Sequence, residues 1–347
     1  MASTLKRDPS IDLMRFIGLT LIILAHLYMP KEWVLFQFRT FDVPLMIFTS
    51  GLAFSGKNTG AYIPFIFKRT LRLIIPVYIF VSLYMLFCPV LHEHGWLKDF
   101  NMEIVKGTYA LRLNPSIGYV WIIRIFLMVM LVTPLLIKIE KKVTNRFAFY
   151  GILACMLAIQ VGLRIWSKGF RSESQLTNIL VKDWVAYIFG YSSIFLMGLR
   201  FRKCEWKEKL AVIVVLAAAM GAMALLMESP NGNRFFFMND FKYPPHAYFL
   251  VWGALISCIL WATAKWWTFV LNNSLFVFIG QNTIWIYLWH IPFVNIFLYG
   301  PLDGYPYPVR YICIYAASVA IYAIQYNIVK AIERKWPKNP VTRYFVG

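Results

Sequence analysis

The chain has 347 residues, of which 60% are hydrophobic and only 15% are charged, and its mean hydropathy is +0.60. Because a soluble domain carries about 25% charged residues, this composition excludes a soluble enzyme, a disordered chain and a disulfide scaffold, and it predicts an integral membrane protein. The formal charge of +19 is assigned to the loops of such a protein and not to a nucleic-acid partner. Five scattered cysteines form neither a disulfide framework nor a zinc-binding pattern.

Ten apolar runs separated by short polar loops follow one another along the chain. A membrane-spanning helix needs about 20 apolar residues, and most of the runs approach that length. They cover residues 11–30, 40–56, 72–91, 117–137, 147–166, 184–201, 209–228, 246–264, 273–299 and 309–332. The sequence therefore predicts an all-α, polytopic helix bundle with about ten transmembrane helices, forming one integral membrane domain over residues 1–347.

The orientation of this bundle follows from the distribution of Lys and Arg, which are enriched in cytoplasmic loops. With the N-terminus inside, the cytoplasmic segments hold 21 of the 35 basic residues and the opposite loops hold 12, while Arg15 and Arg124 lie within runs. Both termini are therefore predicted to be cytoplasmic. The first run lacks a small-residue cleavage site and contains ionisable residues, so we expect a permanent helix and not a signal peptide.

Ionisable residues inside a membrane span are costly and indicate function by default. In the first run, Arg15 and His26 are 11 residues apart, which leaves them only about 20° from the same side of a helix and about 16 Å apart along it. Arg15 is then predicted near the cytoplasmic rim and His26 in the outer half of the bilayer. Alternatively, Arg15 reaches lipid headgroups and His26 makes a helix–helix hydrogen bond.

A second histidine lies at a similar predicted depth. His290 is about 17 residues into the ninth run, and His26 is about 15 residues into the first. Two imidazoles at one depth, which no carboxylate is predicted to share, favour proton-transfer chemistry or a polar cavity. The alternative for His290 is an interfacial histidine beside Trp289 in the aromatic belt.

Three arginines have two interpretations each. Arg124, seven residues into the fourth helix, is either an anion or hydroxyl clamp near the histidines or a side chain that reaches water. Arg69 and Arg72, spaced i and i+3 before the third run, either bind phosphate through their planar groups or provide ordinary positive-inside charge.

Three consecutive residues in a predicted loop could in principle ligate a metal ion. His92, Glu93 and His94 offer ligating atoms, but a solvated outer loop explains them much better, and no third and fourth ligands of a zinc site are evident. We therefore expect no metal requirement.

Five stretches, taken in order, resemble the motifs of the integral-membrane acyltransferase family 3. They are "IDLMRFIGLTLIILAHL" with Arg15 and His26, "FDVPLMIFTSGLAFSG" with Ser50 and Gly51, "KRTLRLIIPVY" with Arg69 and Arg72, "VWIIRIFLMVMLVTPLL" with Trp121 and Arg124, and "FIGQNTIWIYLWHIPFV" with Tyr287 and His290. The first helix departs from the family's frequent Asp-Gly-Leu-Arg-Gly, because Leu13 and Phe16 replace its glycines. "FKYPPHAYF", which contains Lys242, resembles a stretch of members found near polysaccharide synthesis.

This resemblance implies transfer of an acyl group, most often acetyl, from cytoplasmic acyl-CoA to a hydroxyl of a cell-envelope glycan or lipid-linked sugar, in the bilayer of a bacterial inner membrane. It assigns CoA phosphates to Arg15, Arg69 and Arg72. His26 is expected to act as general base or transient acyl carrier, and Arg124 and His290 to position the acceptor or stabilise the carbonyl oxygen.

Two other classes of protein compete with an enzyme. A translocator of an anionic or lipid-linked substrate would also need a polar stripe and cytoplasmic arginines, but no related halves are visible between residues 1–170 and 171–347. A scaffold subunit would leave the stripe shared by Arg15 and His26 unexplained.

Overall fold

The computed structural model describes residues 8–57, 60–97, 99–227, 237–267, 270, 273–300, 304–337 and 339–346, and these contain helices and no strand. The helical elements are α1 (Pro9–Ala25), α2 (Val34–Phe38), η1 (Arg39–Phe41), α3 (Asp42–Phe54), α4 (Tyr62–Glu93), α5 (Met102–Tyr109), α6 (Trp121–Lys142), α7 (Arg146–Gly169), α8 (Gln175–Ile179), η2 (Leu180–Val185), α9 (Ala186–Phe201), α10 (Trp206–Leu226), η3 (Met238–Phe241), α11 (Ala247–Thr263), η4 (Ala264–Trp267), α13 (Ser274–Gln281), α14 (Thr283–Tyr299), α15 (Tyr307–Lys335) and η5 (Thr342–Tyr344).

The predicted all-α membrane fold is confirmed, and every apolar run coincides with helix in the described residues. Seven helical segments are long and apolar enough to cross a membrane: Tyr62–Glu93, Trp121–Lys142, Arg146–Gly169, Gln175–Phe201, Trp206–Leu226, Ala247–Trp267 and Tyr307–Lys335. The other three runs form shorter helices, namely α1, α3 and the α13–α14 pair. Ten spans and cytoplasmic termini therefore stay predictions. Of the basic residues counted for orientation, Lys6, Arg7, Lys98, Arg234 and Lys338 lie outside the described residues.

Two predicted boundaries are wrong because local backbone conformations end the helices early. The first run was expected to continue to residue 30, but α1 ends at Ala25 and Tyr28 adopts a positive φ of 51°. The ninth run is not one helix, since Asn282, with φ −123° and ψ 32°, separates α13 from α14. Its side-chain amide donates to the Phe278 carbonyl at 2.7 Å, a local bond by which Asn competes with regular helix.

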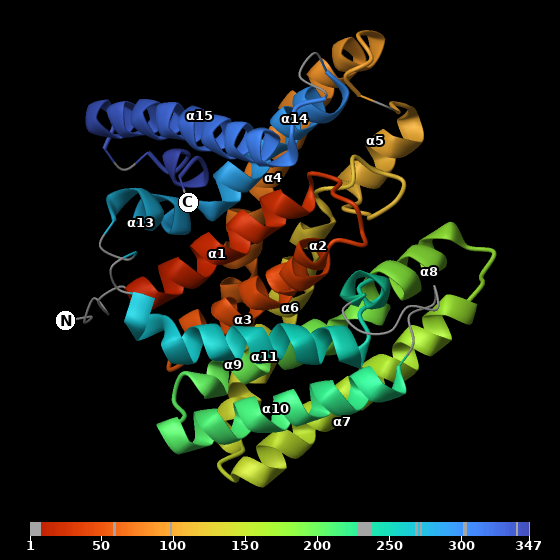
Figure 1. The fold of residues 1–347 in the computed structure, drawn as a ribbon. Coiled ribbons are helices and arrows are strands. Elements are labelled where there is room, and N and C mark those ends of the chain that lie inside the picture. Colours follow the sequence, from red (N-terminus) through yellow and green to blue (C-terminus); the bar gives the residue numbers. More distant parts are fainter. Residues whose placement is uncertain are drawn as a thin grey trace.

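Helices α1 and α3 form the centre of the bundle. Figure 1 shows them between α14 and α15 on one side and α7 and α10 on the other. Nine of the 13 residues of α3 are buried, whereas Val212 is the one buried residue of α10. Consequently α10 exposes an apolar surface that suits lipid, and α3 is a central packing element.

Helices α3 and α9 cross in backbone contact at two glycines. A Cβ atom on Gly51 would lie 2.2 Å from the Phe195 carbonyl oxygen, and a Cβ on Gly198 would lie 2.3 Å from the Phe48 carbonyl oxygen. Small residues allow this approach between membrane helices, where packing replaces the hydrophobic effect. The Ser-Gly pair seen in the sequence therefore has a packing role through Gly51.

Replacing Gly51 with Ala should destabilise the bundle by about 1–3 kcal/mol, because the added methyl group meets rigid backbone. Gly221→Ala in α10 is the matched control, since nothing lies within 4 Å of its added Cβ. The measurement is thermal unfolding of the purified protein in detergent. Equal unfolding midpoints for the two variants would contradict the close backbone contact between α3 and α9 at Gly51.

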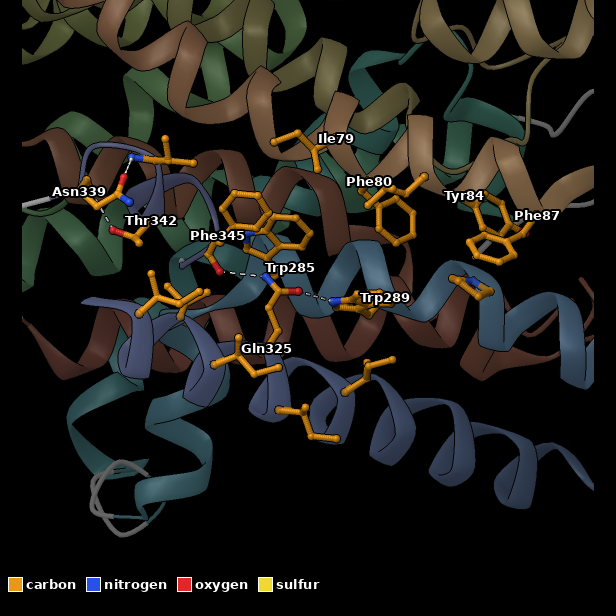
Figure 2. A pocket seen from close by; sticks show the side chains of 18 of the residues that line it. Ile79, Phe80, Tyr84, Phe87, Trp285, Trp289, Gln325, Asn339, Thr342 and Phe345 are labelled. Atoms are coloured by element: carbon orange, nitrogen blue, oxygen red, sulfur yellow. Dashed lines mark hydrogen bonds between the residues drawn. The ribbon is translucent and has the colours of Figure 1, made fainter. Parts of the chain in front are cut away.

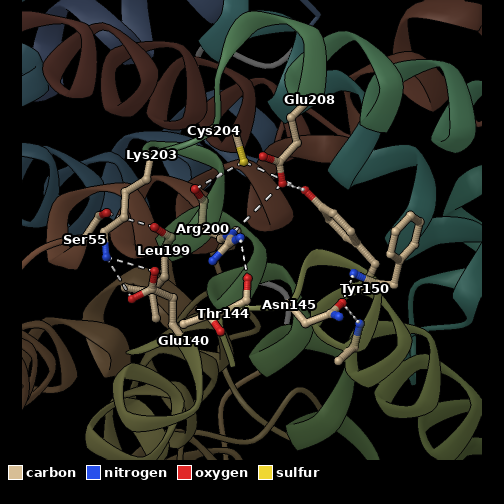
Figure 3. A network of polar contacts seen from close by, with 12 residues as sticks. Ser55, Glu140, Thr144, Asn145, Tyr150, Leu199, Arg200, Lys203, Cys204 and Glu208 are labelled. Carbon is tan, nitrogen blue, oxygen red and sulfur yellow. Dashed lines mark hydrogen bonds and ion pairs between the residues drawn. The ribbon is translucent and has the colours of Figure 1, made fainter. Parts of the chain in front are cut away.

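Polar contacts at one face of the bundle join the end of α6 to the end of α9, and the start of α7 to the start of α10 (Figure 3). Lys203, after α9, forms an ion pair of 2.8 Å with Glu140 of α6. Tyr150 of α7 donates to Glu208 of α10 at 2.9 Å. Nearby, Arg202 pairs with Asp8 before α1 at 3.0 Å. These contacts bring together the segments that the charge count assigns to the cytoplasm.

The charge distribution and this shared face make a topological prediction. A reporter fused after residue 346 should be cytoplasmic, and one inserted after Glu173, in the loop between α7 and α8, should be on the opposite side. Reporter activity on each side of the membrane is the measurement. A cytoplasmic Glu173 fusion would contradict the predicted helix directions.

Candidate functional site

Two cavities in the bundle contain most of the residues that the sequence singled out. The arginine cavity, of about 380 Å³, is lined by Arg15, Arg69 and Arg72. The histidine cavity, of about 320 Å³, is lined by His26 together with charged side chains. Both are also lined by Ile22, Ile122 and Tyr287. The cavities therefore meet at a common wall in the middle of the bundle.

The two histidines are in direct contact. His26 follows the last residue of α1, and its Nδ1 lies 2.7 Å from Nε2 of His290 on α14. Their rings are nearly parallel, with centroids 4.9 Å apart and an interplanar angle of 19°. Tyr119 packs edge-on against His26 at 4.7 Å. The two imidazoles, which the sequence predicts at one depth, thus form a hydrogen-bonded pair.

The hydrogen-bond chain indicates which nitrogens carry protons. Nδ1 of His290 is hydrogen-bonded to the Tyr287 backbone carbonyl, which only accepts, so this nitrogen is the donor. In a neutral imidazole Nε2 of His290 then accepts, and Nδ1 of His26 must donate to it. The Nε2 lone pair of His26 remains, and no protein group among the described residues donates to it. In this tautomer Nε2 of His26 is free to accept a hydrogen bond.

In the arginine cavity, a buried carboxylate positions one of the three arginines. Asp12, which is 3% exposed, lies 3.6 Å from Arg15 and accepts from Gln281 of α13 at 3.4 Å. Arg69 and Arg72 come from α4, which begins at Tyr62 and not near residue 72 as expected. The early start places both arginines one helical turn apart on a regular helix, so their side chains reach the same cavity.

The positive charge at this face extends beyond the three arginines. Lys57 lines an adjoining cavity with Arg15 and Arg202. Burial lowers the pKa of the Lys57 ammonium, and the neighbouring guanidinium groups lower it further. Cations held this close together repel one another, and a polyanion would relieve that repulsion.

The position of Arg124 bears on one of its two sequence-based interpretations. Its side chain is fully buried and does not reach water, so the snorkelling interpretation is wrong. It lies 3.5 Å from Asp183 and donates to the Leu111 carbonyl at 3.1 Å. Arg124 is not among the residues lining either cavity. It connects α6 to η2 and to the segment after α5, and the structure adds nothing to its predicted clamp role.

Sequence analysis missed the three buried charged residues of the histidine cavity: Arg39, Asp42 and Lys242. Arg39 and Lys242 were counted as outer-loop charges, and Asp42 was overlooked although it lies in the second run. The expectation that no carboxylate shares the depth of His26 is therefore wrong. The i, i+3 spacing of Arg39 and Asp42 was the available signal for a pair at this helix start.

A larger cavity of about 830 Å³ lies between α4, α14, α15 and η5, away from this chemistry. Its described lining includes no Asp, Glu, Lys, Arg or His. Figure 2 shows Gln325 accepting from Trp289 at 2.7 Å and donating to the Phe345 carbonyl at 2.9 Å. These bonds fix the docking of the C-terminal segment and carry no reactive group.

His92 and Glu93 were expected in a loop, but they form the end of α4, and His94 caps that helix. The ring nitrogens of both histidines bond to nearby backbone. Nδ1 of His92 bonds the Leu97 carbonyl at 3.0 Å, and Nδ1 of His94 bonds the Val90 carbonyl at 2.9 Å. Within the described ranges, no three His, Cys, Asp or Glu side chains gather closely enough to hold a metal ion. Whether the protein needs a metal stays untested.

The fold and the cavities define a polytopic helical membrane protein in which the half-buried His26 contacts the buried His290 near a basic cavity. Comparison with protein families identifies it further, because the acyltransferase domain model of acyltransferase family 3 matches residues 8–332. The chain belongs to this family and is a membrane acyltransferase. No curated protein matches it. The family match favours the enzyme over the translocator and scaffold alternatives.

The arginine cavity makes a prediction about the donor. If Arg69 and Arg72 bind phosphate through paired N–H groups, the double variant Arg69→Lys, Arg72→Lys should raise the acyl-CoA KM, because an ammonium lacks the planar fork. About tenfold is expected for the loss of one such charged hydrogen bond. Steady-state kinetics in membranes provides the measurement.

Lys138→Arg, in the last turns of α6, is the control for changing a basic residue outside the cavity, and it should leave KM unaltered. If the double variant has an unaltered KM, Arg69 and Arg72 do not bind the CoA phosphates and provide only positive-inside charge.

Proposed function

We propose that the protein is an O-acyltransferase that moves an acyl group, and specifically acetyl, from cytoplasmic acyl-CoA to a hydroxyl of a cell-envelope glycan or lipid-linked sugar. The observation that carries this proposal is the common wall of the two cavities, one lined by three arginines and one lined by His26, which is hydrogen-bonded to His290. Such an arrangement suits a phosphate-rich donor entering from one face and an acceptor held near the other.

The donor half rests on charge and position. Arg15, Arg69 and Arg72 supply the fixed positive charge that CoA phosphates need, and Ile22 and Ile122 provide an apolar wall toward His26. A thioester arm following this wall would run along α1, where the Arg15-to-His26 rise is about 16 Å. Acetyl-CoA is proposed as the donor on this basis and on the family's usual activity.

The chemical step needs a base, because a sugar hydroxyl is a weak nucleophile at neutral pH. Nε2 of His26 takes the hydroxyl proton as the oxygen attacks the acyl carbon. The carbon–sulfur bond of the thioester breaks, and His26 returns the proton to the leaving thiolate. The products are an ester and the CoA thiol, and no other reactant is consumed.

His290 is a positioning residue in this mechanism. Its Nε2 accepts a hydrogen bond from Nδ1–H of His26. This bond holds the His26 proton on Nδ1, so the Nε2 lone pair of His26 stays available. It also stabilises the imidazolium that forms when His26 takes a proton, since the hydrogen bond strengthens as His26 becomes charged.

The test uses isolated membranes supplied with acetyl-CoA radiolabelled in the acetyl group. Wild-type membranes should transfer label to glycan and release CoA, and His26→Gln should lower that rate about 10²- to 10⁴-fold, the usual contribution of a positioned base. Gln retains volume and hydrogen bonding but cannot take a proton. No labelled glycan and no CoA release with wild-type membranes would overturn the proposed function.

Two changes at His290 complete the comparison. His290→Gln should retain measurable turnover, because its carboxamide oxygen can still accept from His26. His290→Leu should lose more activity, because it removes the acceptor. If His26→Gln keeps more than about a tenth of wild-type turnover, far above the loss expected for a missing base, the base assignment is wrong.

A further inference from the structure

The histidine cavity has an excess of positive charge. Its lining includes Lys31, Arg39 and Lys242 against a single carboxylate, Asp42. Lys31 is exposed at the cavity edge, whereas Arg39, Asp42 and Lys242 are only 2%, 1% and 3% exposed. The buried cluster alone therefore combines two cations with one anion.

Both carboxylate oxygens of Asp42 already accept hydrogen bonds from neighbouring groups. Its Oδ2 accepts from Nη1 of Arg39 at 2.9 Å, and its Oδ1 accepts from Nζ of Lys242 at 3.2 Å. The same Oδ1 also accepts from the backbone N–H of Val43 at 2.7 Å. One carboxylate thus pairs with two cations and neutralises only one of them.

Both cations keep unused donors. Nε of Arg39 is buried and has no hydrogen-bond partner. The Lys242 ammonium has three N–H groups, and among the described residues Asp42 is its one hydrogen-bond acceptor. Burial lowers the pKa of the Lys242 ammonium, Asp42 raises it, and the neighbouring Arg39 lowers it.

A buried charge is costly unless it is paired, and an incomplete ionic cluster costs more than a complete one. The missing partner is an anion. We propose that the histidine cavity binds the acceptor sugar through an anionic group, a carboxylate or a phosphate, which Arg39 and Lys242 hold. Naming this ligand as the acceptor rests on the proposed function, whereas the anion preference of the cavity does not.

The same cavity contains His26, so an acceptor held by its anionic group presents its hydroxyls to the base within one enclosure. A volume of about 320 Å³ is at the lower end of ligand pockets and suits a small ligand such as one sugar residue. CoA phosphates have their own basic surroundings in the arginine cavity. The two anionic substrates would therefore be held in different cavities.

Binding to the purified full chain in lipid nanodiscs, without acyl-CoA, tests this inference. Thermal unfolding is followed during titration with glucuronate, glucose 1-phosphate and glucose, and the midpoint shifts give each Kd. At least one anionic sugar should bind about tenfold more tightly than glucose, as expected for one charge-assisted hydrogen bond. Glucuronate and glucose 1-phosphate distinguish a carboxylate from a phosphate.

Two substitutions of Lys242 complete the design. Lys242→Met keeps the length without the charge and should abolish the preference, while the ligand-free protein unfolds at the same or a higher temperature because an incompletely paired charge is gone. Lys242→Arg should retain the preference. The inference is overturned if wild type does not distinguish either anionic sugar from glucose, or if the preference survives in Lys242→Met.

A different outcome would identify a different role. If wild type shows no binding preference and Lys242→Met lowers kcat without changing the acceptor KM, the cluster stabilises the carbonyl oxygen and does not bind the acceptor. That result also overturns the inference. Because the binding measurement uses no donor, its failure is separable from a failure of radiolabel transfer, which tests the proposed function.

Discussion

Charged side chains in a bilayer require partners, and this requirement organises the interior of the protein. Arg124 is fully buried and is held by Asp183. Asp12 connects Arg15 on its own helix with Gln281 on α13. Each such contact joins elements that are distant in the sequence. The polar groups inside the bundle therefore fix the relative positions of the helices as well as providing its chemistry.

Incompletely paired charges line both cavities, and Arg124 and Arg164, which line neither, also have buried N–H groups without a hydrogen-bond partner among the described residues. The arginine cavity collects cations from α1 and α4 at one face, and the histidine cavity contains two buried cations for one carboxylate, Asp42. Fully paired positions such as Glu140 with Lys203 lie outside both cavities.

Helix interruptions place the reactive groups. Because α1 ends at Ala25, His26 stands at the helix end, and the break at Asn282 separates α14, which carries His290, from α13. Tyr322 of α15 donates to the Asn282 side chain at 2.6 Å, so the break is held by tertiary packing. The imidazole contact depends on both interruptions.

The sequence by itself determined the membrane class, the positions of the helices and the common depth of His26 and His290, because hydropathy and helical spacing are local properties of the chain. It did not determine helix ends, which depend on backbone conformations at residues such as Asn282. Nor did it reveal Lys242 as a neighbour of Asp42, since 200 residues separate them and a cation in a predicted loop resembles ordinary surface charge. Only the tertiary structure decided which charges meet, because pairing across a bundle depends on the three-dimensional crossing of helices and leaves no periodic pattern in the sequence.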